Sequence, residues 1–113
     1  MKNGIRDIEI VGGGLAGLSL GIALRRHGVP VTLYEARSYP RHKVCGEFIA
    51  GLDRETVEAL GIAEELSDAI QHRQVAWMQD GRVFRRDELP SPAFGVSRYA
   101  LDARLAQRFE RED

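Results

Sequence analysis

The sequence of 113 residues contains a single cysteine, Cys45, which excludes an internal disulfide. Proteins of oxidising compartments often use disulfides, so this scarcity favours a reducing cytoplasm as the location. An excess of charge of either sign is also lacking, because 16 Lys and Arg face 17 Asp and Glu, for a formal net charge of −1. Proteins that bind nucleic acid usually carry a clear basic excess, so the composition argues against such a partner.

Long apolar runs are lacking as well. None approaches the roughly 18 residues that a transmembrane helix needs, so no transmembrane segment is expected. The opening stretch, MKNGIRDIEIVGGG, passes almost at once into a strand pattern, which predicts that no signal peptide is present. With 43% hydrophobic and 29% charged residues, the composition is that of one ordinary globular domain.

Apolar segments and glycines alternate in a definite order near the beginning of the sequence. Residues 8–11 predict a short strand, residues 15–27 an apolar helix, and residues 31–34 a second, β-branched strand. Gly28 suits the position just past the end of the helix, and Pro30 blocks its continuation. This order predicts a β-α-β unit with parallel strands and a right-handed crossover.

The glycines between the first strand and the helix form the pattern Gly-x-Gly-x-x-Gly. Gly12 allows a sharp turn, Gly14 lets a pyrophosphate approach the backbone, and Gly17 lets helix and strand pack closely. The N–H groups of the first helical turn, with Leu15 and Ala16, would face the phosphates at the positive end of the helix dipole.

Glu35 ends the second strand, 23 positions after Gly12. A carboxylate there can accept hydrogen bonds from both ribose hydroxyls and would repel a 2′-phosphate, which favours FAD or NAD over NADP. Glycines in an apolar helix can serve packing alone. The ordered series of strand, glycine turn, helix, strand and terminal acid is much more specific, and it indicates adenine-dinucleotide binding.

The middle of the chain carries weaker signals. Residues 36–51 look irregular. A short helix is then predicted, with Asp53 as N-cap and Gly61 after its last turn, and residues 63–70 predict a further helical stretch.

A hairpin and a last helix are predicted near the end of the sequence. Residues 74–78 and 82–86 flank Asp80-Gly81, a dipeptide that fits a type I′ turn. After a loop that contains prolines, Ser97 can cap a final helix whose apolar residues recur every four positions.

Two stretches resemble a known family. The stretch EARSYPRHKVCGEFI resembles the loop after the first β-α-β unit in flavoprotein oxidoreductases of the geranylgeranyl reductase family. Wider relatives are the para-hydroxybenzoate-hydroxylase-like monooxygenases and the flavin-dependent halogenases. The matching elements are Pro40-Arg41, Lys43 and Cys45-Gly46-Glu47. The later stretch GVSRYALDARLA resembles the family's Arg-x-x-Leu-Asp-x-x-Leu helix start, with Arg98 as its first residue.

This resemblance implies FAD as cofactor, with NAD(P)H as a possible electron donor. It implies that Cys45 and Gly46 lie against the flavin or the substrate cavity, and that Arg98 and Arg41 reach the cofactor. Cys45 could equally be a small inert thiol, and Arg41 part of a solvated loop. No residue is assigned to catalysis or to a metal, because redox chemistry in this family belongs to the flavin.

The expected fold is α/β: an incomplete, Rossmann-like (GR2-type) FAD/NAD(P)-binding fold with a β-hairpin insertion. Residues 1–113 would form the N-terminal part of a single FAD-binding domain of an oxidoreductase or monooxygenase. Its full-length form would take a small apolar or aromatic substrate. The later Gly-Asp motif and substrate-binding sheet of the family are lacking. Two alternatives are a NAD-binding dehydrogenase module and a non-catalytic Rossmann remnant that serves as an interaction module.

Overall fold

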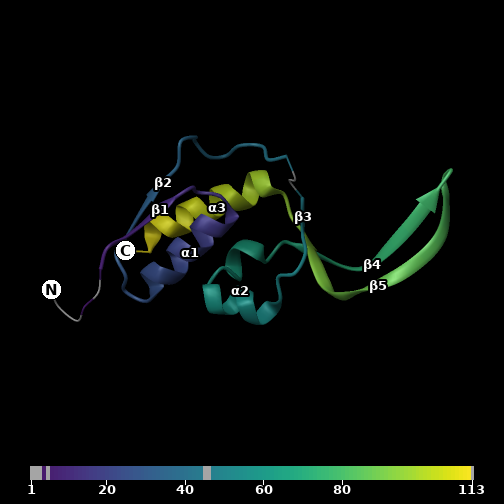
Figure 1. The fold of residues 1–113 in the computed structure, drawn as a ribbon, viewed down its shortest axis with the longest axis horizontal. Helices are drawn as coiled ribbons and strands as arrows, with labels where there is room; N and C mark the ends of the chain where they lie inside the picture. Colours follow the sequence, from purple (N-terminus) through teal and green to yellow (C-terminus); the bar gives the residue numbers. More distant parts are fainter. Residues whose placement is uncertain (1–3, 5, 45–46, 113) are drawn as a thin grey trace.

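The computed structural model describes residues 4, 6–44 and 47–112. An α/β body carries a long hairpin that projects away from it, and the molecule measures 63 × 29 × 20 Å (Figure 1). The elements in chain order are β1 (Ile8–Val11), α1 (Leu15–Arg26), β2 (Val31–Tyr34), β3 (Phe48–Ile49), α2 (Arg54–Leu60), the 3₁₀ helix η2 (Glu64–Leu66), β4 (Ile70–Gln79), β5 (Arg82–Gly95) and α3 (Arg98–Arg111).

The predicted β-α-β unit is confirmed. β1 and β2 pair in parallel, with Ile8 opposite Val31 and Val11 opposite Tyr34. The crossover helix α1 ends at Arg26, one residue before the predicted end.

The core lies between this small sheet and the two long helices. α1 and α3 lie side by side (Figure 1), and both contribute residues to one buried cluster with β1 and β2. Leu101 and Leu105 of α3 are fully buried in it, as the four-residue apolar spacing predicted. α3 also begins as predicted, because the Ser97 hydroxyl accepts a hydrogen bond from the Ala100 N–H.

α2 has the predicted ends, but the helix expected over residues 63–70 is wrong. The Asp53 carboxylate accepts from the Thr56 N–H at 2.8 Å, and Gly61 adopts a left-handed conformation past the last turn. Only the single turn η2 follows. Ile70, the predicted last residue of this helix, instead begins β4 and pairs with Gly95. Local helix propensity yields here to pairing with a distant strand.

The stretch expected to be wholly irregular, residues 36–51, contains the short strand β3. Phe48 lies opposite Gly95 and Ile49 opposite Phe94, in an antiparallel pair with β5. Two residues are too few to show a strand period in the sequence, and the partner lies far along the chain.

The hairpin is confirmed at its turn and is longer than predicted. Asp80 and Gly81 both have positive φ, at 50° and 76°, as a type I′ turn requires. β5 continues to Gly95 through the prolines that were predicted to lie in a loop. The ladder shifts register between the pairs Gln74–Glu88 and His72–Ala93, so Pro90 and Pro92 lie where the pairing is interrupted. Proline is tolerated there because no regular ladder hydrogen bond requires its missing N–H.

Candidate nucleotide-binding site

The glycine turn between β1 and α1 has the geometry that its sequence pattern predicted. Gly12 has φ +108°, and its N–H donates to the Tyr34 carbonyl at 2.8 Å. A Cβ on Gly17 would lie 1.9 Å from the Gly12 carbonyl oxygen, so only glycine permits this approach of α1 to the turn. Gly14 is the N-cap of α1, and a Cβ there would meet only the Lys43 ammonium, at 3.7 Å.

The first turn of α1 has no side-chain cap. Gly14 offers no side-chain oxygen, and the first turn contains no acidic residue. Leu15 is half-buried and packs against the core, whereas Ala16 is exposed. The first N–H groups of a helix have no partner within the helix, so this end of α1 is suited to an anion.

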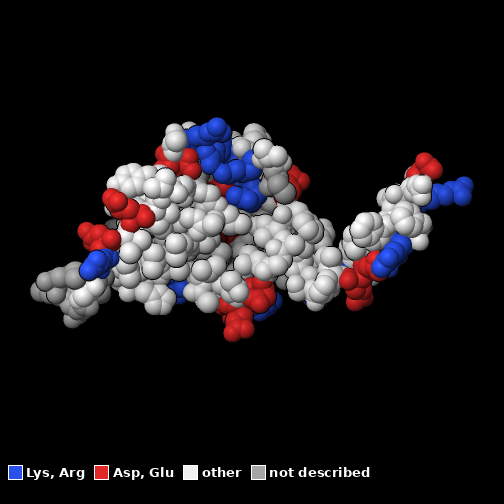
Figure 2. Space-filling model, in the orientation of Figure 1, with Lys and Arg blue, Asp and Glu red and all other residues white. Residues whose placement is uncertain are grey.

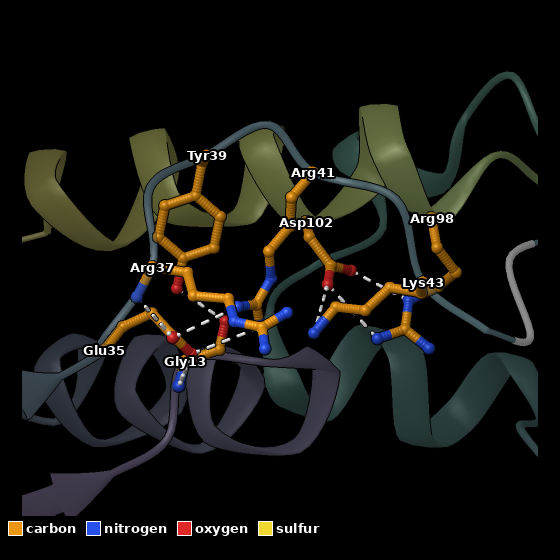
Figure 3. Close-up of polar contacts among 8 residues, drawn as sticks. All are labelled: Gly13, Glu35, Arg37, Tyr39, Arg41, Lys43, Arg98 and Asp102. Carbon is orange, nitrogen blue, oxygen red and sulfur yellow. Dashed lines mark hydrogen bonds and ion pairs between the residues drawn. The ribbon is translucent and has the colours of Figure 1, made fainter.

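Glu35 lies at the end of β2, directly beside the glycine turn (Figure 3). Its carboxylate accepts from the backbone N–H of Arg37 at 2.9 Å and of Gly13 at 3.0 Å. The Arg41 guanidinium donates to both carboxylate oxygens, at 3.2 and 3.3 Å. These backbone donors, with the charge of Arg41, lower the pKa of Glu35 below its ordinary value, so the side chain is an anion at neutral pH.

Gly13 occupies one of the unspecified positions of the pattern, yet the structure also requires glycine there. A Cβ on Gly13 would lie 2.0 Å from the Tyr39 hydroxyl and 3.1 Å from Cβ of Glu35. The Tyr39 hydroxyl donates to the Gly13 carbonyl. The sequence signal was the middle glycine of the run Gly12–Gly14, which the Gly-x-Gly-x-x-Gly pattern does not demand.

Residues 36–43, here called the strap, pass over the glycine turn (Figure 3). Tyr39, Arg41 and Lys43 are half-buried, and Pro40 and His42 between them are exposed. The three half-buried side chains face the turn, because Tyr39 contacts Gly13, Arg41 contacts Glu35 and Lys43 lies at Gly14. Tyr39 and Lys43 are not among the predicted site residues, because residues 36–51 carry no regular apolar period in the sequence.

The remaining predicted arginine, Arg98, lies at the start of α3 in a cluster around Asp102 (Figure 3). Asp102 is fully buried and accepts from Arg98 Nε at 2.8 Å and from Arg98 Nη2 at 3.2 Å. Lys43 Nζ lies 3.7 Å from the second carboxylate oxygen. Arg98 is thus paired with Asp102. The cation that lies beside Gly14 is Lys43. The sequence pattern of the helix start contains both Arg98 and Asp102. It does not indicate that Asp102 contacts Lys43 of the strap.

The site as a whole carries an excess of positive charge. Three cations, Arg41, Lys43 and Arg98, face two carboxylates, Glu35 and Asp102. In Figure 2 a group of Lys and Arg side chains lies over the strap. The structure brings together all the predicted site residues that it describes, at the glycine turn or on the strap and helix that flank it. Cys45 and Gly46 lie outside the described residues.

Two clefts differ in their relation to this site. One of about 460 Å³ adjoins the strap, and its lining residues are His42, Lys43, Glu47, Ser97 and Tyr99. The other, of about 400 Å³, lies between α2 and the base of the hairpin and contains none of the predicted site residues. Among the residues that the structure describes, no cluster of His, Cys, Asp and Glu could hold a metal. In the same part of the chain, no helix is long and apolar enough to cross a membrane.

Comparisons with known proteins agree with the geometry. Residues 10–43 match the family of NAD(P)-binding Rossmann-like domains. The 3-amino-4-hydroxybenzoate 2-monooxygenase of Streptomyces platensis is 35% identical, over 96% of this chain and 28% of its own length. Menaquinone reductase of Mycobacterium tuberculosis is 30% identical, over 88% of this chain and 25% of its own length.

Solved structures show the same fold. A 2-methyl-3-hydroxypyridine-5-carboxylic acid oxygenase matches with a TM-score of 0.79 at 24% identity, over 96% of this chain and 30% of its own. The flavin-dependent monooxygenase PieE, solved with FAD and substrate, matches with a TM-score of 0.75 at 22% identity, over 99% of this chain and 23% of its own. The chain thus spans less than a third of the length of these proteins. In sequence and in fold, the chain is similar to the nucleotide-binding portion of flavin-dependent monooxygenases and related oxidoreductases.

Proposed function

We propose that this chain binds FAD and that residues 1–113 form the N-terminal part of a single FAD-binding domain. The observation that carries the proposal is the ionised Glu35 carboxylate, held by the Gly13 N–H beside the uncapped start of α1. An anion that accepts hydrogen bonds and a helix end that donates them lie next to each other. An adenosine diphosphate group carries both matching parts, a ribose diol that donates and a pyrophosphate that accepts.

The pyrophosphate would lie at the glycine turn. N–H groups of Gly14, Leu15 and Ala16 would donate to it, supported by the positive end of the α1 dipole. Gly12 and Gly17 act indirectly, because they shape the turn and let α1 start close to it. Lys43 adds an ammonium within reach of Gly14.

The two arginines would act at the edges of the site. Arg41 pairs with Glu35 and can extend a donor to the ribose or the adjoining phosphate. Arg98 lies on the far side of Lys43, toward the cleft between the strap and α3. The family resemblance assigns Cys45 and Gly46 to the flavin end of the cofactor.

FAD, when bound, supplies the redox chemistry, and this chain supplies its binding and orientation. For the whole protein we propose a flavin-dependent oxidoreductase or monooxygenase in the cytoplasm, with NAD(P)H as electron donor. The relatives named above and a squalene epoxidase of Arabidopsis thaliana act on aromatic or apolar compounds. A small substrate of that kind is therefore proposed here.

A second candidate is NAD binding, which the matched Rossmann-like family favours. NAD shares the adenosine diphosphate group with FAD, so the glycine turn and Glu35 serve both. The strap, α3 and the similarity to a flavin-dependent monooxygenase favour FAD.

Calorimetric titration of the purified chain with FAD, NAD⁺ and NADP⁺ tests the proposal. We expect FAD to bind most tightly and NADP⁺ most weakly, because Glu35 repels a 2′-phosphate. Glu35→Ala removes the charged acceptor of the ribose diol and should lower FAD affinity on the order of tenfold or more. Glu9→Ala is the matched control, because Glu9 lies on β1 and its carboxylate contacts Tyr34.

Each outcome has a definite meaning, provided that circular dichroism shows folded variants. Equal FAD affinity of wild type and Glu35→Ala would show that Glu35 does not bind the ribose. Tighter binding of NAD⁺ than of FAD would favour the dehydrogenase module. Binding of neither nucleotide would favour the interaction module.

A further inference from the structure

We propose that Asp102 is a positioning residue, which holds the Lys43 ammonium at the phosphate end of the site. This inference rests on the proposed function, because it concerns how the chain prepares its glycine turn for a diphosphate. The family pattern includes both Arg98 and Asp102, but the resemblance assigned a role only to Arg98. The structure shows that this aspartate is the partner shared by two cations.

The burial of Asp102 is the first step of the argument. A carboxylate with no exposed surface must be paired, because an isolated buried charge is very costly. Arg98, one turn earlier on α3, donates to both of its oxygens and supplies that pairing. Lys43 is therefore not needed to neutralise Asp102. The cluster of Arg98, Lys43 and Asp102 has a net charge of one positive unit, which Lys43 supplies.

The position of Lys43 is the second step. Three distant segments meet at its ammonium: the strap, α3 through Asp102, and the start of α1 through Gly14 (Figure 3). A lysine side chain has four flexible carbon–carbon bonds, and free in solvent it would sample many rotamers. The contact with Asp102 selects the rotamers that keep Nζ near the turn.

The electrostatics of this position are the third step. The N-terminal end of a helix carries a partial positive charge, so an ammonium beside α1 is repelled by the helix dipole. α1 has no acidic residue in its first turn to offset this repulsion. Asp102 attracts the ammonium from the opposite side. A diphosphate at the turn would then meet both the helix end and a cation already in place.

Removal of Asp102 distinguishes positioning from simple attraction by the sign of its effect. A buried negative charge near a phosphate site repels the phosphate, so charge alone predicts tighter binding for Asp102→Asn. Loss of the positioned ammonium predicts weaker binding. The sign of the change in ADP affinity therefore shows which of the two effects is larger.

The experiment measures binding of ADP by calorimetry and of adenosine by ligand-observed NMR, for wild type and variants. We expect Asp102→Asn and Lys43→Met each to weaken ADP about fivefold to tenfold and to change adenosine less than twofold. The double variant should bind ADP no more weakly than Lys43→Met alone. Asp68→Asn is the matched control, because Asp68 also accepts from an α3 arginine, Arg104, and should leave both affinities unchanged.

Several results would overturn the proposal. These are tighter ADP binding by Asp102→Asn, an equal loss for ADP and adenosine, or additive losses in the double variant. Unchanged ADP affinity in Lys43→Met would overturn it whatever Asp102→Asn shows. Should Asp102→Asn fail to fold, Asp102→Glu keeps the charge and displaces the carboxylate, and it must show the selective ADP loss. Absence of ADP binding by the wild type would refute the proposed function itself, a result distinct from all of these.

Discussion

At the scale of the residue, Glu35 combines two tasks. Its carboxylate organises the glycine turn and the strap by accepting from Gly13, Arg37 and Arg41. The same group is the proposed acceptor of the ribose hydroxyls. Because carboxylate oxygens offer several lone-pair positions, backbone donors and a ribose can be accepted together.

The lowered pKa of Glu35 leads to a prediction about stability and pH. A depressed folded-state pKa contributes stability above the ordinary value of 4.5, and this contribution is lost as the pH falls through the folded-state pKa. Glu35→Gln should therefore melt at a lower temperature than wild type at pH 7. The difference should stay constant down to about pH 5.5 and then shrink toward more acidic pH.

Thermal melts from pH 8 to pH 3 check this prediction. Glu110 is an exposed carboxylate on α3, so Glu110→Gln is the control for the general effect of losing one negative charge. A gap between wild type and Glu35→Gln that grows as the pH falls would contradict the role of the three donors.

At the scale of the element, an aromatic contact joins the last turn of α3 to α1, in addition to the core that the two helices share. A Cβ on Gly21 of α1 would lie 2.7 Å from the ring of Phe109, so the ring fills the space left by the glycine. Arg25 lies 3.7 Å above the same ring and donates to the carbonyls of Phe109 and Val31. This arrangement joins α1, β2 and the last turn of α3. It orients α3, whose other end carries Arg98 and Asp102.

Phe109→Ala should lower the free energy of unfolding by about 3 kcal/mol, the usual cost of removing a buried phenylalanine ring. Phe84→Ala in the exposed hairpin is the control and should change it by less than about 0.5 kcal/mol. Urea denaturation followed by circular dichroism measures both. Similar values for the two variants would show that α3 is not held by this contact.

At the scale of the whole molecule, two surfaces lack the covering that such elements usually have. Parallel sheets are normally buried on both faces, yet Val11 and Tyr34 are exposed on the face of β1–β2 away from α1. The outer part of the hairpin is a two-stranded ribbon, and its exposed residues include Trp77, Met78 and Phe84. Free strand edges with apolar side chains favour pairing with another chain.

The purified chain should therefore self-associate through the hairpin as its concentration rises. Phe84→Lys should shift this association to higher concentration, because a charge on the ribbon opposes edge-to-edge pairing. Leu20→Lys is the control, since Leu20 is an exposed apolar residue on α1. Light scattering across a concentration series measures the shift. Equal effects of both substitutions would place the contact elsewhere.

The sequence by itself determined the parts of the molecule whose causes are local. Strand period, glycine spacing, the Asp53 and Ser97 caps and the Asp80-Gly81 turn act within a few residues, so they could be predicted together with the position of Glu35.

The tertiary structure alone decided which side chains meet across the site. Gly13 needs its small size because Tyr39 lies on it, and Lys43 reaches Gly14 beside Asp102 of a helix far along the chain. The strand β3 exists only because β5 pairs with it. These features depend on contacts between segments separated by tens of residues. Local sequence patterns do not show which distant segments come into contact.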